Sequence, residues 1–361
     1  MKTIDDINDV KGKKILVRTD FDVPISPEGI IGEEFRILRQ KPLVERLVSG
    51  GARLVLVAHT SAVSSFEHAV PNLERLLGVN IVFCKNLDAL ASFWQTDASV
   101  ALLDNVRSYS GEEENDTDFA RQLAEGCDAY INNCFSTSHR AHASIAGVVA
   151  LLPAYAGPVV VEEVSQLSRV VDSPKEGKII FMGGAKTGTK IPVICRLIDK
   201  ADYIVVGGVL ANGLLKERGF DIGSSRVDEN VHSLIDGLNV HDPRLIFPSD
   251  FRKEDAAFMD IGEESMQRFS ELVQGAKLIV WNGPFGKFED ARFTSGTEAI
   301  ARALVASGAQ TIIGGGDTIA ALNQFGLLDS FSFISTGGGA MLAFLAGEKL
   351  PGLEALGYYN D

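Results

Sequence analysis

In the second half of the chain, the candidate ligand-binding residues are glycine-rich junctions, that is, turns that come directly after predicted strands. Glycine lets backbone N–H groups approach a ligand closely, and a helix N-terminus behind such a turn favours phosphate. Ligands of open parallel sheets bind outside the carboxyl ends of the strands. Repeated junctions therefore predict a nucleotide or polyphosphate site, whereas one alone is compatible with turn chemistry. The junctions are Gly183-Gly184, Gly207-Gly208, Asn282-Gly283-Pro284, Gly314-Gly315-Gly316-Asp317 and Ser335-Thr336-Gly337-Gly338-Gly339.

Two lysines and one aspartate accompany these glycines. The segment 183–190 resembles a Walker A loop but does not match it, because Gly188 is followed by Thr-Lys where that loop needs Lys-Ser/Thr. We therefore expect another binding geometry, with Lys186 and Lys190 as candidate phosphate contacts; the alternative is that both are solvated. Asp317 could be a helix N-cap or a ligand of a phosphate-bound Mg²⁺.

Polar and largely cationic residues follow the predicted strands of the first half. Arginine and histidine gathered at the ligand-binding edge of an acidic protein predict capture of a small carboxylate or phosphate. Each residue taken singly is better explained as a surface charge or a helix cap, and only the edge that they share indicates a site. The residues are Asp20-Phe21-Asp22, Arg36, His59, Asn105-Val106-Arg107, and Asn132-Asn133 leading to His139-Arg140-Ala141-His142.

The elements that must position these residues alternate along the chain. Short apolar runs between stretches of helical period predict an α/β fold of two Rossmann-like lobes with parallel sheets. Strands are expected at Lys14–Arg18, Leu54–Ala58, Asn80–Cys84, Val100–Leu103, Ala129–Ile131, Lys178–Met182, Tyr203–Val206, Lys277–Trp281, Thr311–Ile313 and Phe331–Ile334. Helices are expected at Pro42–Ser49, Asp116–Glu125, Val193–Ala201, Gly296–Ala306 and Asp317–Gln324.

A helix at Val159–Asp172, bounded by proline and glycine before it and a polar turn after it, is predicted to connect the lobes as a rod and hinge. The alternative is an ordinary surface helix. The predicted domains are a lobe for a small anion at 1–156, the linking helix at 157–174, a nucleotide lobe at 175–345 and a tail at 346–361 that could return to the first lobe. One lobe for a small anion and one for a nucleotide describe a kinase that closes around its substrates.

Composition excludes several classes of protein. The 361 residues carry 34 Lys and Arg against 48 Asp and Glu, and the net charge of −14 argues against nucleic acid or an anionic membrane as partner. No apolar stretch reaches the ~18 residues that span a bilayer, and the N-terminus lacks a signal-peptide pattern. Four cysteines without CxxC spacing indicate reduced thiols in a cytoplasmic protein.

Eight segments, in order along nearly the whole chain from Val17 to about Leu356, resemble phosphoglycerate kinase. They are VRTDFDVP (17–24), LLDNVRSYSGEE (102–113), CFSTSHRAHAS (134–144), GGAKTGTKI (183–191), VWNGPFGKFE (280–289), GTEAIARAL (296–304), GGGDTIAAL (314–322) and STGGGA (335–340). The resemblance implies phosphoryl transfer between ATP and the carboxylate of 3-phosphoglycerate with Mg²⁺, in glycolysis or gluconeogenesis, by a monomer.

The resemblance also implies a role for individual residues. Those that would bind 3-phosphoglycerate are Asp20, Asp22, Arg36, His59, Arg107 and Arg140. Those that would bind ATP or ADP are Gly184, Lys186, Lys190, Gly208, Asn282, Glu289, Gly315, Gly316, Asp317 and Thr318, with Asp317 as the metal ligand. Arg36, Lys186 and Gly338 would act on the transferring phosphoryl group.

The chain departs from the family pattern at four positions. Ala62 stands where the family has the phosphate-binding arginine of His-Leu-Gly-Arg-Pro, and Asp22 stands where it has asparagine. Thr189 replaces an acidic residue before the second lysine, and Val209 replaces a glycine of the adenine wall. Three interpretations stay open: an active phosphoglycerate kinase, a kinase for a related acid, and a catalytically weak or non-catalytic relative that binds nucleotide or regulates.

Overall fold

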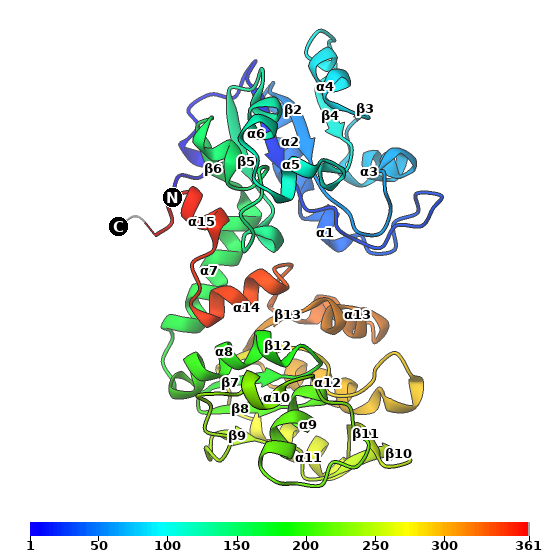
Figure 1. Ribbon diagram of the computed structural model, residues 1–361, viewed down its shortest axis with the longest axis vertical. Coiled ribbons are helices and arrows are strands. Elements are labelled where there is room, and N and C mark those ends of the chain that lie inside the picture. The colour runs from blue at the N-terminus through cyan, green and yellow to red at the C-terminus, as the bar shows by residue number, and fades with distance from the viewer. Residues whose placement is uncertain (360–361) are drawn as a thin grey trace. The chain divides into compact units, whose positions relative to one another are not determined.

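The computed structural model describes residues 1–359, and these divide into two compact units (Figure 1). Unit 1 holds Met1–Val164 and the segment from Lys349 onward, and unit 2 holds Ser165–Glu348. The division falls inside helix α7 (Pro158–Asp172), so the helix expected at Val159–Asp172 is present. The predicted domain boundaries and the role of this helix as a hinge stay predictions.

Unit 1 is built on a six-stranded parallel sheet in the order β3-β4-β2-β1-β5-β6. The central strands are almost wholly buried, because their near-continuous apolar runs are covered on both faces. Its strands are β1 (Lys14–Arg18), β2 (Arg53–Val57), β3 (Val82–Cys84), β4 (Val100–Leu103), β5 (Ala129–Asn132) and β6 (Ala154–Ala156). Its helices are α1 (Phe35–Leu38), α2 (Lys41–Ser49), α3 (Val70–Leu77), α4 (Leu87–Phe93), α5 (Ser110–Glu113), α6 (Thr117–Ala124) and α15 (Pro351–Ala355).

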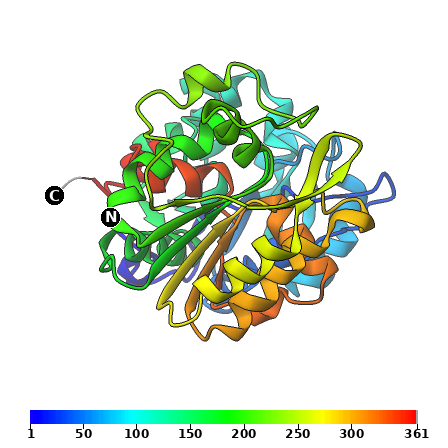
Figure 2. The same ribbon diagram turned by 90° about the horizontal axis from the view of Figure 1, so that it is seen from below.

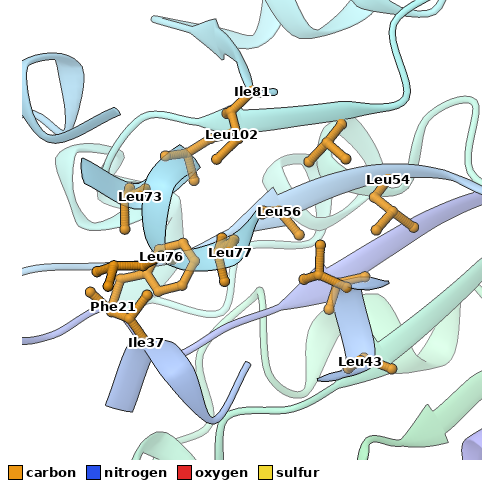
Figure 3. Packing of buried hydrophobic residues seen from close by; sticks show 14 of the residues in the cluster. Phe21, Ile37, Leu43, Leu54, Leu56, Leu73, Leu76, Leu77, Ile81 and Leu102 are labelled. Atoms are coloured by element: carbon orange, nitrogen blue, oxygen red, sulfur yellow. The ribbon is translucent and has the colours of Figure 1, made fainter. Parts of the chain in front are cut away.

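One apolar cluster covers the face of this sheet where α1, α2 and α3 pack (Figure 3). Leu54 and Leu56 alternate along β2 to point into it, and Leu73, Leu76 and Leu77 of α3 recur at helical spacing. Burial of this face holds the carboxyl ends of β1 and β2, and the polar residues that follow them, in fixed positions.

Unit 2 carries a second six-stranded parallel sheet in the order β14-β13-β12-β7-β8-β9. If β7 is counted as strand 1 of the unit, the order read from β9 to β14 is 3-2-1-4-5-6, as in dinucleotide-binding sheets. The switch point of this order lies between β7 and β12. Figure 2 shows helices on both faces of the sheet. The strands are β7 (Lys178–Met182), β8 (Tyr203–Val206), β9 (Leu245–Ile246), β12 (Leu278–Asn282), β13 (Gln310–Gly314) and β14 (Phe333–Ile334). The helices are α8 (Thr187–Leu197), α9 (Gly208–Glu217), α10 (Val231–Leu234), α11 (Glu263–Leu272), α12 (Ser295–Ala306), α13 (Gly316–Gln324) and α14 (Gly339–Ala346).

The predicted α/β class and parallel sheets are confirmed, with differences in detail. β3 begins at Val82 rather than Asn80, and β2 lies one residue earlier than predicted. The antiparallel hairpin of β10 (Phe251–Glu254) and β11 (Ala257–Ile261) was not predicted, because its half-exposed strands carry no continuous apolar run. Among residues 1–359, no helix is both long and apolar enough to cross a membrane.

Among the helices that were predicted, α8 departs most from its expected bounds. It begins at Thr187, six residues before the predicted start at Val193, because Pro192 lies inside the helix rather than ahead of it. Proline removes the hydrogen bond to the carbonyl four residues earlier, which belongs to Gly188. Gly188 lies in the exposed first turn, where water can serve that carbonyl. The helix N-terminus therefore lies next to Lys186.

Candidate active site

A cavity of about 540 Å³ opens in unit 2 at the carboxyl ends of the strands. This volume is in the usual range for a site that takes a nucleotide-sized molecule. Predicted site residues Gly184, Gly208, Glu289 and Asp317 line it. The cavity therefore lies where the order of the strands predicts a ligand.

Glycines are required where the β7 and β12 junctions meet beside this cavity. A Cβ on Gly183 would lie 2.4 Å from the Pro284 carbonyl oxygen, and a Cβ on Gly283 would lie 2.2 Å from the Gly183 carbonyl oxygen. The Gly184 N–H donates to the Pro284 oxygen at 2.6 Å, which locks the two junctions together. This close packing brings backbone to the edge of the cavity without side chains between it and a ligand.

Lys186, Lys190 and Asp317 lie together at this edge. The pKa of the Lys190 ammonium is lowered to about 8, chiefly by burial; the Asp317 carboxylate opposes this shift and the Lys186 charge adds to it. Lys190 is buried and donates to the Ala185 carbonyl, whereas Lys186 is exposed and caps α8 in the left-handed region, with φ of 63°. A non-glycine residue held there stores local strain, which is common at functional sites.

Asn282 and Asp317 give this edge groups that fit a metal–nucleotide. The buried Asn282 Nδ2 has no hydrogen-bond partner among the described residues, so it can donate to an incoming oxygen. Within residues 1–359 no group of three His, Cys, Asp or Glu side chains could hold a metal. A single carboxylate suits Mg²⁺ that arrives on phosphates, because Mg²⁺ takes one or two protein carboxylates besides phosphate oxygens and water.

Two threonines hold the β12 junction in place. Gly283 N–H donates to Thr318 Oγ1 at 2.8 Å, and the N–H groups of Phe285 and Gly286 donate to Thr297 Oγ1 at 3.1 and 3.2 Å. Thr318, a predicted nucleotide contact, is thus buried and supports the loop. Gly315, with φ of 95°, precedes α13, whose first residue is Gly316. Gly338, with φ of 50°, precedes α14 and does not line the cavity.

The predicted anion-binding residues of unit 1 gather into one cationic cluster. The pKa of Arg107 is lowered first by burial and then by the charges of Arg140 and Arg18, while Asp22 opposes the shift. Arg107 also lowers the pKa of His59, after burial and Arg18. Like charges held this close repel each other, so an anion bound among them is stabilised.

Arg36 faces Asp20 at one side of this cluster. Their Nη1 and Oδ2 atoms are 3.6 Å apart, too far for a hydrogen bond, and Asp20 Oδ2 is buried without a partner of that kind. Burial lowers the pKa of Arg36, but the carboxylates of Asp20, Glu33 and Asp22 outweigh it and raise the pKa. Arg36 is therefore a charged, loosely held guanidinium with donors to spare.

A buried chain of hydrogen bonds orients His59. Most of its members were not predicted from the sequence. Arg18 donates from Nη2 to His59 Nδ1 at 3.0 Å and from Nε to Ser144 Oγ at 2.9 Å, and Ser144 Oγ donates to Glu112 at 2.6 Å. Because arginine only donates, the His59 proton must be on Nε2, which faces Asp22 Oδ2 at 3.5 Å. Arg18 was predicted only as the end of a strand; its partner Ser144 is 126 residues away in sequence, and no local signal links them.

The free energy of unfolding should depend on pH because three buried or half-buried histidines are kept neutral in the folded protein. Burial lowers the pKa of His59, His139 and His142 below 6.5, so the folded protein keeps them neutral where the unfolded chain takes up protons. The free energy of unfolding should hold above pH 6.5 and fall as the pH drops through 6.5 toward the folded pKa values, by up to about 1.4 kcal/mol per pH unit for each fully shifted histidine.

Urea unfolding between pH 5 and 7.5 measures this slope. His59→Gln should make it shallower, and His68→Gln, which changes an exposed histidine of the same unit, should leave it unchanged. Equal slopes for the wild type and His59→Gln would mean that His59 is not neutral in the fold.

The comparisons with known proteins agree with this geometry. The family model described as phosphoglycerate kinase matches residues 4–348. Phosphoglycerate kinases of Synechococcus sp. (strain JA-3-3Ab) and Pelotomaculum thermopropionicum are 39% and 38% identical, covering 96% and 98% of both chains. The crystal structure of phosphoglycerate kinase from Pyrococcus horikoshii OT3 superposes with a TM-score of 0.88 at 28% identity over 100% of both chains, and that from Coxiella burnetii with 0.82 at 31% over 99%.

Proposed function

The chain belongs to the phosphoglycerate kinase family, and we propose that its unit 2 cavity holds the nucleotide and its unit 1 cationic cluster holds 3-phosphoglycerate. The activity is the transfer 1,3-bisphosphoglycerate + ADP = 3-phosphoglycerate + ATP, a step of glycolysis. The observation that carries the assignment is the nucleotide-sized cavity whose rim brings Lys186, Lys190 and Asp317 together at the switch point of the sheet.

The acceptor in this reaction needs no general base. A carboxylate is already ionised at neutral pH, and its oxygen attacks the γ-phosphorus while ADP leaves as an anion. Catalysis then rests on alignment and on neutralising charge. The arginines of unit 1 suit this task, because Arg36, Arg107 and Arg140 stay charged and present several donors in a plane.

We assign the substrate contacts within each unit separately. Arg107 and Arg140 bind the phosphate or carboxylate of 3-phosphoglycerate, and Arg36 neutralises the acceptor carboxylate. His59 donates from Nε2 to the substrate once this N–H has turned from Asp22 to the incoming anion. Asp20 and Asp22 line the same cluster. The nucleotide contacts are Gly184, Lys186, Lys190, Gly208, Asn282, Glu289, Gly315, Gly316, Asp317 and Thr318.

Asp317 is the proposed ligand of the Mg²⁺ that accompanies the nucleotide. When bound, the ion neutralises phosphate oxygens. Lys186 adds positive charge at the transferring group, and Gly338 presents N–H groups of the first turn of α14. The protein is proposed to act as a monomer in the cytoplasm. Size-exclusion chromatography with light scattering tests the oligomeric state, and cell fractionation tests the location.

A coupled assay with 3-phosphoglycerate and MgATP tests the function directly. Turnover that depends on 3-phosphoglycerate supports the proposal. Nucleotide binding without turnover would favour the non-catalytic interpretation, which Ala62 and Asp22 motivate, and turnover of another acid alone would reassign the substrate.

Nucleotide should also stabilise unit 2 against heat. A ligand that binds only the folded state at 100 times its Kd stabilises it by about 2.7 kcal/mol, which corresponds to roughly 5–10 °C for a unit of this size. We expect this rise with MgADP in differential scanning fluorimetry and a smaller rise with ADP in EDTA. No shift at millimolar MgADP would contradict the nucleotide assignment.

A further inference from the structure

The hairpin β10–β11 forms a wall of the unit 2 cavity that the phosphate-binding residues do not use. Phe251 and Phe258 both line the cavity, and their rings stack at a centroid distance of 4.0 Å and an angle of 9°. Within unit 2, Figure 1 shows this hairpin well apart from α13, where the phosphates are assigned. A nucleotide with its phosphates at Asp317 therefore extends its base toward the hairpin, where an aromatic wall suits any base because every base has a π-face.

Arg226 lies next to this wall on a well-anchored segment. Phe258 N–H donates to Ser225 Oγ at 2.8 Å, Asn212 Nδ2 donates to the Arg226 carbonyl at 3.1 Å, and Thr187 N–H donates to Asp228 at 2.5 Å. These bonds tie residues 225–228 to the hairpin, to α9 and to the N-terminus of α8. Arg226 is thus held at the lining of the cavity beside the hairpin.

The Arg226 guanidinium is free to bind a ligand. Two other arginines of unit 2 are paired with carboxylates: Arg244 pairs with Asp199 and Asp242, and Arg292 pairs with Asp290 and Glu254. Among residues 1–359, Arg226 has neither an ion pair nor a side-chain hydrogen bond, although the chain has an excess of acidic residues. A cation without a partner in a nucleotide-sized cavity fits an acceptor on the ligand.

The donors of arginine match one purine better than the other. Guanine presents two acceptors side by side, N7 and O6, which arginine contacts in a bidentate manner. Adenine presents the N7 acceptor beside the N6 amino donor, and arginine has no acceptor to meet that donor. Arginine at this wall therefore favours guanine, while the stacked rings accept either base.

We propose that this kinase accepts guanosine nucleotides as well as adenosine nucleotides and that Arg226 gives guanine the advantage. The inference deepens the proposed function and rests on it, because it takes the unit 2 cavity as the nucleotide site. Glutamine is the informative replacement, because its amide offers one donor and one acceptor and pairs with adenine N7 and N6.

Calorimetric titration with MgGDP and with MgADP tests the inference on the wild type, Arg226→Gln, Arg226→Leu and the control Arg268→Gln. Arg268 is an exposed arginine of α11 outside the cavity lining. We expect the wild type to bind MgGDP at least as tightly as MgADP. Arg226→Gln should shift the ratio of the two Kd values toward adenine by roughly 10- to 100-fold, the discrimination typical of one bidentate pair. Arg226→Leu should remove the guanine advantage, and Arg268→Gln should keep the wild-type ratio.

A wild type that binds MgADP but not millimolar MgGDP overturns the inference, as does a ratio that neither Arg226 variant moves. The coupled assay with 3-phosphoglycerate and each triphosphate separates the two claims. Turnover with a ratio that does not depend on Arg226 keeps the proposed function and rejects the inference. Base discrimination in binding without any turnover keeps the role of Arg226 and rejects the proposed function.

Discussion

Replacing Lys186 with alanine is expected to lower kcat by roughly 10²- to 10³-fold, the usual effect of removing one preorganised charge donor from a developing negative charge. Lys186 is suited to that role because its backbone is held in the left-handed region at the start of α8 while its side chain is exposed. The charges of Lys186 and Asp317 both shift the pKa of Lys190, so the three groups lie close together. Because Asp317 lines the cavity, Lys186 lies at its rim.

The stability of the Lys186→Ala variant should change little. Alanine has the same Cβ as lysine, so the backbone strain at φ of 63° is unaltered, and an exposed side chain loses little packing. Lys216→Ala on α9 removes an exposed lysine outside the cavity lining and should leave both turnover and melting temperature unchanged. Steady-state kinetics with saturating substrates and a thermal melt measure both properties; undiminished kcat in Lys186→Ala would move the transferring group elsewhere.

The predictable part of the fold is its buried strands. Val100–Leu103, Lys178–Met182 and Tyr203–Val206 have the bounds that were predicted for them, because strands covered on both faces have near-continuous apolar runs. The hairpin β10–β11 breaks this rule. Arg252 and Lys253 are exposed on it, and its packing rests on Phe251 and Phe258, which stack across its two strands, and on the buried end of β11.

The site could be predicted where its residues follow strands and not where distant segments meet. The β12 junction shows the first case, since Asn282 ends the strand, Gly283 follows it, and both lie beside the β7 junction. Asp22 shows the second. Its Oδ1 accepts from Ser61 N–H and Ser61 Oγ, both at 2.8 Å, and these residues are 39 positions apart. Such a contact depends on the pairing of β1 with β2, which no local pattern encodes.

The chain lacks a charge where it would bind the phosphate of 3-phosphoglycerate, and this should weaken substrate binding. Ala62 supplies no guanidinium, and Asp22 adds a carboxylate to the same cluster. Burial raises the pKa of Asp22, but hydrogen bonds from His59 and Ser61 outweigh it and hold the pKa well below its usual range. Asp22 is therefore anionic at neutral pH and repels an anionic substrate.

The double variant Ala62→Arg with Asp22→Asn should therefore lower KM for 3-phosphoglycerate by roughly 10- to 100-fold, because one charge-assisted contact contributes about 1.5–3 kcal/mol. Ala62 is exposed, so an arginine fits there without repacking. KM for ATP should barely move, since the cavity is lined by residues of unit 2 alone. Each single variant should give part of the gain.

The competing explanation is that another cation already replaces the missing arginine, with His68 and Arg75 as candidates on α3 or just before it. Arg75 is the weaker of the two, because its guanidinium is 2.6 Å from Glu34. If either serves the substrate, the double variant gains nothing and His68→Ala or Arg75→Ala raises KM for 3-phosphoglycerate instead. If no variant alters this KM while a different acid is phosphorylated well, the cluster recognises that acid, and Asp22 and Ala62 are the residues that select it.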